Sequence, residues 1–127
     1  MMDTQSSQQT ILIVDDEPIL TELFSDILSE YYDVRLASTA LEAQQVCCSN
    51  DIALIISDYH LGMQNSDHLF EWVIAQQPGL AKRFILLTGD QLSDLSSFEG
   101  IATILYKPVA IDVLLHTVKT LLRGTDA

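Results

Sequence analysis

The chain has 127 residues, 48% of them hydrophobic, which is enough for one domain with a sizeable core. Eighteen acidic residues outnumber six basic ones, and the net charge of -12 disfavours binding to nucleic acid or to an anionic membrane surface. A divalent cation or a basic protein surface is the natural counterpart of such a charge.

No apolar run approaches the roughly 20 residues that a membrane-spanning helix needs, and the first nine residues are polar and unlike a signal peptide. We therefore expect a cytosolic protein with a flexible tail at residues 1–9, a folded domain at residues 10–122, and a tail or truncated linker at residues 123–127. Cys47 and Cys48 are adjacent and lack the spacing of a zinc or redox motif, so ordinary free thiols are expected.

The first half of the chain alternates apolar runs with helical patterns. The run Thr10–Val14 ends abruptly in Asp15-Asp16, and apolar residues at helical spacing continue from about Pro18 to Glu30. A short strand is predicted at Asp33–Ala37 and a helix at Thr39–Cys48. The side chains expected to face the core are Ile19, Leu20, Leu23, Phe24, Ile27 and Leu28 in the first helix and Leu41, Ala43 and Val46 in the second.

The second half continues the alternation with three more apolar runs. The run that begins at Ile52 ends in Asp58, the run Phe84–Leu87 ends in Thr88-Gly89, and the run Ile101–Tyr106 ends in Lys107-Pro108. An irregular stretch, residues 59–66, precedes a helix in which Trp72 is expected to pack while partly exposed. The expected inner faces are Leu69, Phe70, Val73 and Ile74 in that helix, Leu92, Leu95 and Phe98 in a short helix, and Val109, Val113, Leu114, Thr117, Leu121 and Leu122 in the last helix.

Strands that are continuously apolar are covered on both faces, and strands that alternate with helices form parallel sheets through right-handed crossovers. The pattern therefore predicts a doubly wound α/β domain with a five-stranded parallel sheet. Ligands of such sheets bind beyond the carboxyl ends of the strands. The polar residues that follow the strands, and are therefore expected to meet there, are Asp15, Asp16, Asp58, Thr88 and Lys107.

Each of these residues has an ordinary explanation when it is taken alone. An Asp after a strand is a common helix cap, Thr88 ends a strand, and Lys107 is a solvated charge. Their shared location favours function, because three crowded carboxylates must hold protons or attract a cation. Mg²⁺ suits oxygen ligands of this kind, and together with a carboxylate nucleophile, an ammonium and a hydroxyl it completes the groups that phosphoryl transfer requires.

The ordered combination of Asp15-Asp16, Asp58, Thr88-Gly89 and Lys107-Pro108 resembles the response regulator receiver domain, the phosphoacceptor module of two-component signalling. The likeness extends from about residue 10 to residue 122. It implies a flavodoxin-like (βα)5 fold with strand order 2-1-3-4-5, an order that receiver proteins exemplify.

By its position, Asp58 resembles the phosphoacceptor of that family. Thr88 matches the hydroxyl that follows the phosphoryl group, and Lys107 matches the ammonium that contacts it. The resemblance also implies a cis peptide bond between Lys107 and Pro108; without it, Pro108 reads simply as a helix start.

The same resemblance implies a Mg²⁺ site. Asp16 is expected to bind the ion directly, Asp15 through water, and Asp58 as a further ligand. The backbone carbonyl of His60 completes the expected set, so that the imidazole of His60 is not itself a ligand.

The implied function is to accept a phosphoryl group from a histidine kinase or a histidine phosphotransfer protein and to switch conformation. The chain is expected to catalyse its own modification and slow hydrolysis, without turnover of an external substrate. A downstream effector domain or a second copy of the chain is an expected further partner, without direct contact to nucleic acid or membrane. No effector segment follows Leu122, so we expect either a stand-alone receiver or a piece of a larger regulator or hybrid kinase.

Three alternatives remain open from the sequence. The first is a pseudo-receiver, an interaction module that is never phosphorylated. The second is a Mg²⁺-dependent phosphohydrolase, although the chain lacks a cap domain and has His60 where such enzymes place a second Asp. The third is a flavodoxin-like cofactor binder, although no phosphate-binding loop rich in Gly or hydroxyl residues follows the first strand.

The chain departs from the family pattern at several positions. Gly62 replaces the usual Pro, Ser66 replaces the usual Gly, and Ile104 replaces the usual aromatic switch residue, for which Tyr106 is not equivalent. The interval from Thr88 to Lys107 is also slightly short. We therefore expect switching to work through movement of Thr88, a backbone shift or altered order of the fourth helix.

Two further hypotheses concern dynamics and turnover. Phosphorylation is expected to move Thr88, because its hydroxyl gains a charged acceptor only after modification. His60 and Asp90 lie two residues beyond Asp58 and Thr88, and they are expected to tune the lifetime of the phosphorylated state.

Overall fold

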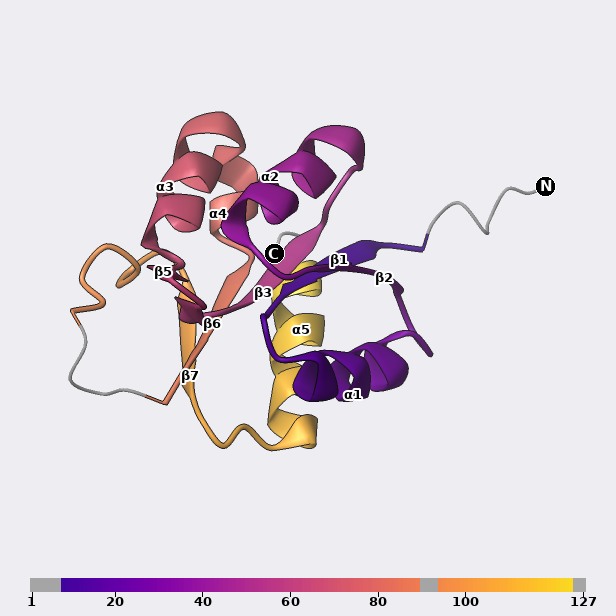
Figure 1. Ribbon diagram of the computed structural model, residues 1–127. Coiled ribbons are helices and arrows are strands. Elements are labelled where there is room, and N and C mark those ends of the chain that lie inside the picture. The colour runs from indigo at the N-terminus through magenta and orange to yellow at the C-terminus, as the bar shows by residue number, and fades with distance from the viewer. Residues whose placement is uncertain (1–7, 90–93, 125–127) are drawn as a thin grey trace.

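A computed structural model describes residues 8–89 and 94–124 of the chain. Its centre is a five-stranded parallel sheet with the spatial order β2-β1-β3-β6-β7 (Figure 1). Counted along the sheet strands alone this is the order 2-1-3-4-5, so the predicted topology is confirmed. The sheet strands are β1 (Thr10–Val14), β2 (Asp33–Ala37), β3 (Leu54–Asp58), β6 (Phe84–Thr88) and β7 (Thr103–Tyr106).

Helices cover both faces of the sheet, as the continuously apolar strands predict. In Figure 1, α2, α3 and α4 lie above the sheet, and α1 and α5 lie below it. Alternate residues of each strand enter one of two cores: Leu12 and Ile55 contribute to the first, and Ile11 and Ile56 to the second. The helices are α1 (Pro18–Leu28), α2 (Ala40–Ser49), α3 (Asp67–Gln76), α4 (Pro78–Ala81) and α5 (Ile111–Gly124).

The register of the sheet brings the carboxyl ends of its strands to one edge. Val14 pairs with Ser57 of β3, so the residues that follow β1 lie beside the end of β3. Main-chain hydrogen bonds extend the alignment past the strands: the N–H of Tyr59 donates to the Leu87 carbonyl at 2.8 Å, and the N–H of Lys107 donates to the Thr88 carbonyl at 2.8 Å. The polar residues after β1, β3, β6 and β7 therefore share one edge.

The helix faces predicted from periodicity are correct at their centres and wrong at their margins. Phe24, Leu28, Ala43 and Leu114 are buried as expected. A stripe of apolar residues gives the direction of a helix face, but the sheet beneath covers only part of its length and width, so the outer members remain exposed. The predicted inner residues that are exposed are Ile19 at 82%, Leu41 at 64%, Val113 at 47%, Leu23 at 46% and Ile74 at 37%.

The stretch between β3 and α3, predicted as irregular, contains a small antiparallel hairpin. Strand β4 (His60–Leu61) pairs with β5 (Gln64–Asn65), and Gly62 in the loop between them has a φ of 67°. Residues with a side chain rarely adopt this backbone conformation, which explains the glycine at this turn.

The short helix predicted between Thr88 and β7 is absent from the described part of that segment. Residues 94–102 form successive turns, in which the N–H of Phe98 donates to the Leu95 carbonyl and the N–H of Ala102 donates to the Phe98 carbonyl. Leu95 and Phe98 are buried as predicted, and Leu92 lies outside the described residues. Phe98 anchors the segment because its ring stacks on Phe70 with centroids 4.7 Å apart.

Both cysteines are free thiols, as expected, with Cys47 buried and Cys48 exposed. Trp72 is partly buried against the first core, also as expected. Within residues 8–89 and 94–124, no helix has the length and apolar character to cross a membrane.

Candidate functional site

Three carboxylates meet at the carboxyl edge of the sheet. Asp15 and Asp16 follow β1, and Asp58 ends β3; one oxygen from each lies within 4.8 Å of the others. Asp15 and Asp58 are only 5% and 7% exposed, whereas Asp16 is exposed. The three carboxylates thus meet as predicted from the strand ends, and the structure adds that the cluster has a buried base and one side open to solvent.

Lys107 joins this cluster from the end of β7. Its Nζ lies 2.6 Å from Oδ1 of Asp58, and its side chain is 30% exposed. A contact this short between opposite charges, with the carboxylate largely buried, is a strong charge-assisted hydrogen bond. The peptide bond between Lys107 and Pro108 is cis, as the family resemblance implied.

The charge balance of the cluster is negative. Burial raises the pKa of the Asp15 carboxyl, and the neighbouring Asp58 and Asp16 raise it further; a hydrogen bond donated by the N–H of Glu17 at 2.9 Å and the charge of Lys107 oppose the shift. Three carboxyl groups face one ammonium, and the ligand atoms they offer are all oxygens. This donor set fits a hard divalent cation such as Mg²⁺.

Thr88 is fully buried at the end of β6, the strand that lies between β3 and β7 in the sheet. The register places Asp58 opposite Leu87, the residue before Thr88, and places Thr88 opposite Tyr106, the residue before Lys107. The predicted hydroxyl residue therefore sits between the strands that carry the carboxylate and the ammonium.

His60 is exposed, and its ring contacts the hairpin rather than the carboxylates. Its Nδ1 lies 3.2 Å from Oδ1 of Asn65. The ring therefore has a protein partner of its own; that His60 binds a metal through its main-chain carbonyl stays a prediction. Asp90, predicted to act with His60, lies outside the described residues.

The turn at Gly62 approaches the acidic cluster. A Cβ at this position would lie 3.5 Å from Oδ2 of Asp16, an ordinary van der Waals contact. The hairpin therefore packs beside the open side of the site. The sequence pattern gave no role to Asn65 or to the hydroxyl of Tyr59; the available signal was a single glycine in a short polar stretch, which is typical of a two-residue hairpin loop.

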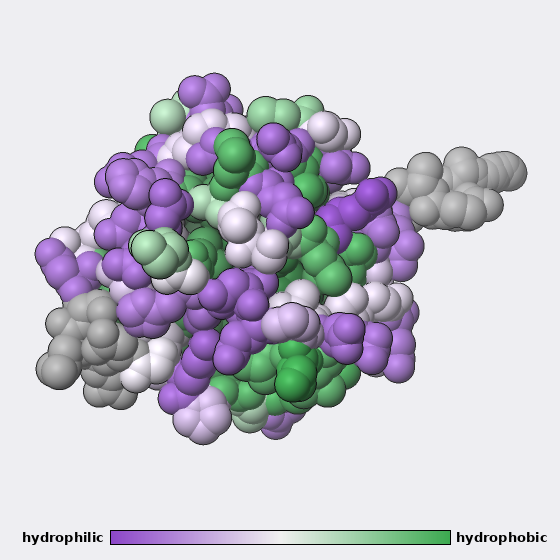
Figure 2. Space-filling view, in the orientation of Figure 1, coloured by the Kyte–Doolittle hydropathy of each residue, from purple (hydrophilic) through white to green (hydrophobic). Residues whose placement is uncertain are grey.

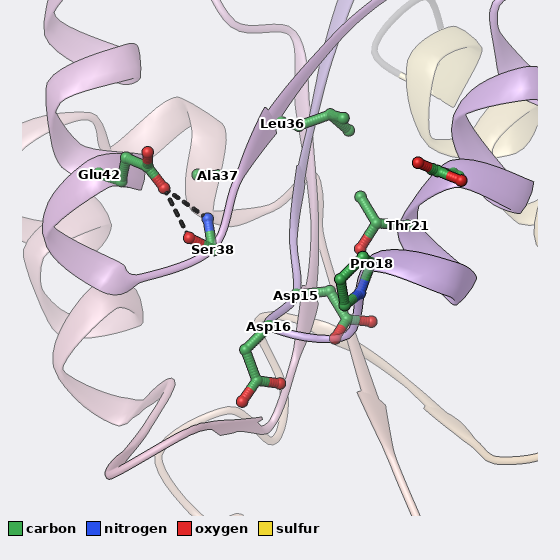
Figure 3. A pocket seen from close by; sticks show the side chains of 9 residues that line it. Asp15, Asp16, Pro18, Thr21, Leu36, Ala37, Ser38 and Glu42 are labelled. Carbon is green, nitrogen blue, oxygen red and sulfur yellow. Dashed lines mark hydrogen bonds between the residues drawn. The ribbon is translucent and has the colours of Figure 1, made fainter.

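A hollow of about 290 Å³ opens beside Asp15 and Asp16, between the start of α1 and the start of α2 (Figure 3). Figure 3 shows Glu42 across the hollow from these two residues, held by hydrogen bonds from the N–H and hydroxyl of Ser38. These bonds lower the pKa of Glu42, so its carboxylate is ionised at neutral pH. Glu22 also lines the hollow, which therefore extends the negative potential around the site.

An apolar groove of about 430 Å³ lies on the other side of Asp15 and Lys107. It runs between α1 and the segment that leads from Pro108 into α5. Figure 2 shows a hydrophobic area in the lower part of this view, over the position of α1. The apolar residues that line the groove are Leu20, Leu23, Phe24, Leu87, Pro108, Val109 and Ile111.

Comparison with known proteins points to one family. The sequence model of the response regulator receiver domain family matches residues 11–119 of this chain. The sensor histidine kinase RcsC of Escherichia coli K12 is 28% identical over 118 residues, which make up 90% of this chain and 12% of RcsC. The chain thus spans a small part of the length of this curated relative.

Two solved structures share the fold over nearly their whole length. A CheY-like response regulator receiver domain protein from Methanospirillum hungatei JF-1 matches with a TM-score of 0.84 and 28% identity, over 94% of this chain and 98% of that one. The response regulator TrrA of Thermotoga maritima, solved in complex with Mg²⁺-BeF, matches with a TM-score of 0.77 and 29% identity, over 90% of this chain and 99% of that one. These matches confirm the predicted flavodoxin-like fold.

Proposed function

Because the chain belongs to the response regulator receiver domain family of two-component systems, we propose that it accepts a phosphoryl group on Asp58. The observation that carries the proposal is the position of this carboxylate, 2.6 Å from Lys107 Nζ and within the cluster that it forms with Asp15 and Asp16. A nucleophilic carboxylate with an ammonium and further oxygen ligands beside it meets the requirements of phosphoryl transfer.

The donor is a phosphohistidine of a histidine kinase or of a histidine phosphotransfer protein. An oxygen of Asp58 attacks phosphorus, a P–O bond forms as the P–N bond breaks, and the electron pair of the broken bond returns to the imidazole nitrogen. Lys107 contacts the oxygens of the transferred group, and the hydroxyl of Thr88 donates a hydrogen bond to one of them. The protein acts mainly through positioning and charge stabilisation.

Asp15, Asp16, Asp58 and the backbone carbonyl of His60 would hold Mg²⁺. When it is bound, this ion neutralises negative charge on the phosphoryl oxygens. Support comes from the all-oxygen donor set of the cluster and its excess of carboxylates over ammonium groups. The complex of TrrA with Mg²⁺-BeF, in a protein of the same fold, supports the same ion.

Hydrolysis of the aspartyl phosphate by water returns the site to its starting state, so the chain catalyses its own modification and its reversal. We expect no turnover of an external phosphate ester.

We assign the receiver to residues 10–122, with residues 1–9 and 123–127 as flanking segments, and we place it in the cytoplasm. An effector domain or a second copy of the chain is the proposed downstream partner.

The apolar groove between α1 and Pro108 supports docking of a protein donor. It borders Asp15 and Lys107, so a partner that covers it would bring its own residues close to the acidic site. Ile19 and Val113 add exposed apolar surface on α1 and α5. Burial of this apolar surface would offset the electrostatic repulsion between a phosphorylated donor and the acidic residues around the site.

The test is to incubate the chain with Mg²⁺ and phosphoramidate and to follow the mass of the intact protein. We expect one phosphoryl adduct that is lost at both acidic and alkaline pH and is absent from Asp58→Asn. A wild-type protein that gains no adduct would favour the pseudo-receiver. Steady hydrolysis of p-nitrophenyl phosphate, removed by the same substitution, would instead favour the phosphohydrolase.

A further inference from the structure

The segment that directly follows Asp58 is closed into a tight loop. His60 pairs with Asn65 in the β4–β5 hairpin, and the N–H of Ser66 donates to the Tyr59 carbonyl at 2.8 Å. The two-residue loop begins with Gly62 at positive φ, the pattern of a type II′ turn. The loop thus returns the chain to the place where it left the sheet.

This hairpin has little core of its own. Leu61 is its one buried residue, and the other members of the two strands and the loop are exposed. Two strands of two residues each are too short to be stable in water by themselves. The position of the loop beside Asp16 must therefore be fixed by contacts to the rest of the domain.

The side chain of Asn65 makes one bond within the hairpin, to His60, and one bond outside it, to Tyr59. Its Oδ1 accepts a hydrogen bond from Nδ1 of His60 at 3.2 Å, and its Nδ2 donates to the hydroxyl of Tyr59 at 3.3 Å. One amide therefore binds both residues that follow Asp58 in the chain.

Tyr59 connects this amide to the interior of the domain. It is 4% exposed, and its ring meets the rings of His60 and Phe98 edge to face, with centroid separations of 5.0 and 6.2 Å. The exposed Asn65 is thereby tied to a buried side chain of the first core. The bond limits how far the main chain at His60 moves relative to Asp58.

We propose that Asn65 is a positioning residue of the acidic site: through Tyr59 and His60 it holds the main chain beside Asp58 and Asp16, and so sets the affinity for Mg²⁺. The proposal rests on the function proposed above, because the His60 carbonyl matters only if the site binds a cation. Groups that orient metal ligands commonly change metal affinity by about 10-fold or more when they are removed.

The experiment measures Mg²⁺ binding by amide chemical shifts in the absence of a phosphodonor, for wild type, Asn65→Ala and Gln64→Ala. Gln64 is the matched control, because it lies in the same strand and is also exposed. We expect Asn65→Ala to raise the Kd for Mg²⁺ about 10-fold and Gln64→Ala to leave it within twofold. Tyr59→Phe, which keeps the ring and removes the hydroxyl, should reproduce part of the increase.

Two further measurements distinguish a loss of loop positioning from a general loss of protein stability. In metal-free protein, Asn65→Ala should accelerate hydrogen exchange of the Ser66 amide while the thermal midpoint stays close to that of wild type. With phosphoramidate, the half-saturating Mg²⁺ concentration should rise while the rate at saturating Mg²⁺ stays within about twofold, since the bound ion restores the loop.

The outcomes are distinct. An unchanged Kd in Asn65→Ala, or an equal increase in Gln64→Ala, would overturn the assignment while leaving the proposed function intact. If the amide shifts of the wild-type protein do not respond to Mg²⁺, this result would contradict both the proposed function and the proposed role of Asn65.

Discussion

The ring of Tyr59, the residue after Asp58, meets the ring of Phe98 edge to face with centroids 6.2 Å apart. Phe98 is fully buried in the turns that precede β7, so this contact joins the acidic site to a segment 40 residues later in the chain. Ile104, at the position where the family places an aromatic switch residue, is partly buried against the same core. We therefore infer that a change at Asp58 reaches this segment through Tyr59, without an aromatic residue at position 104.

The first prediction is that a phosphate mimic perturbs this segment. Addition of Mg²⁺ and beryllofluoride should shift the amide resonances of Gly89, Leu95 and Phe98, because Thr88 gains a charged acceptor and Tyr59 follows Asp58 directly. Phe98→Leu should reduce these shifts beyond Gly89 and cost about 1–2 kcal/mol of stability. Unperturbed amides from residue 94 to residue 98 in the wild-type protein would contradict this coupling.

The strands, and the carboxyl edge of the sheet where the acidic cluster lies, were predictable from the sequence. A strand that is buried on both faces of the sheet leaves a continuous apolar run. Such a run stops where the sheet stops, so Asp58 and Thr88 appear in the sequence as the polar residues at its end. Helix margins were less predictable. Periodicity gives the direction of an apolar stripe, whereas the exposure of Ile19 and Leu41 depends on how far the sheet extends beneath each helix.

The hairpin and its contacts were missed for a different reason. Strands of two residues carry no period, so β4 and β5 leave no alternating pattern in the sequence, and Gly62 is the one signal of the turn between them. The role of Asn65 arises only when the hydroxyl of Tyr59 and the ring of His60 come within reach of one amide, and this depends on the turn at Gly62. The predicted role of Asp90 stays a prediction, because that residue lies outside the described ones.

The second prediction concerns the cost of ionising Asp15. Burial raises the pKa of this carboxyl, so ionisation is less favourable in the folded than in the unfolded chain. The resulting stability is fully present below the unfolded-state pKa and is lost as pH rises through the folded-state pKa. At pH 7.5 in EDTA, Asp15→Asn should therefore be more stable than wild type and should melt at a higher temperature.

Mg²⁺ should stabilise wild type more than it stabilises Asp15→Asn. Wild type at ten times its Kd for Mg²⁺ gains about 1.4 kcal/mol by mass action, whereas Asp15→Asn has lost a ligand charge and should gain much less. Thermal melts of both proteins at pH 7.5, with EDTA and with Mg²⁺, check this. Asp51→Asn is the control, because Asp51 is exposed at the opposite end of β3. Equal Mg²⁺ stabilisation of Asp15→Asn and wild type would contradict the prediction.

The third prediction uses the two adjacent thiols. Burial raises the pKa of Cys47 to about 11, so at pH 8 only about one molecule in a thousand carries the thiolate, and the side chain is also shielded from reagents. Titration with a disulfide reagent should detect one fast thiol per native chain, Cys48, and two in urea. Cys48→Ser should have no fast thiol; a fast thiol in that variant would show that Cys47 is accessible.

The fourth prediction is that removal of the Lys107 ammonium strengthens Mg²⁺ binding and slows phosphorylation. The ammonium lies 2.6 Å from Oδ1 of Asp58 and competes with any cation for that carboxylate. Lys107→Ala should therefore bind Mg²⁺ a few-fold more tightly in the absence of a phosphodonor. Phosphorylation should nevertheless slow by roughly 100-fold, because the transferred group loses a charge-assisted hydrogen bond that forms as its charge develops.

Lys82→Ala serves as the matched control, since Lys82 is exposed after α4 and carries the same charge. It should leave both quantities near wild type, which separates a local contact from a change in net charge. Mg²⁺ titrations followed by amide shifts and phosphoramidate time courses at saturating Mg²⁺ give the two measurements. A parallel loss of binding and rate in Lys107→Ala would mean that Lys107 chiefly maintains the shape of the site, because only a direct role at the phosphoryl group separates the two effects.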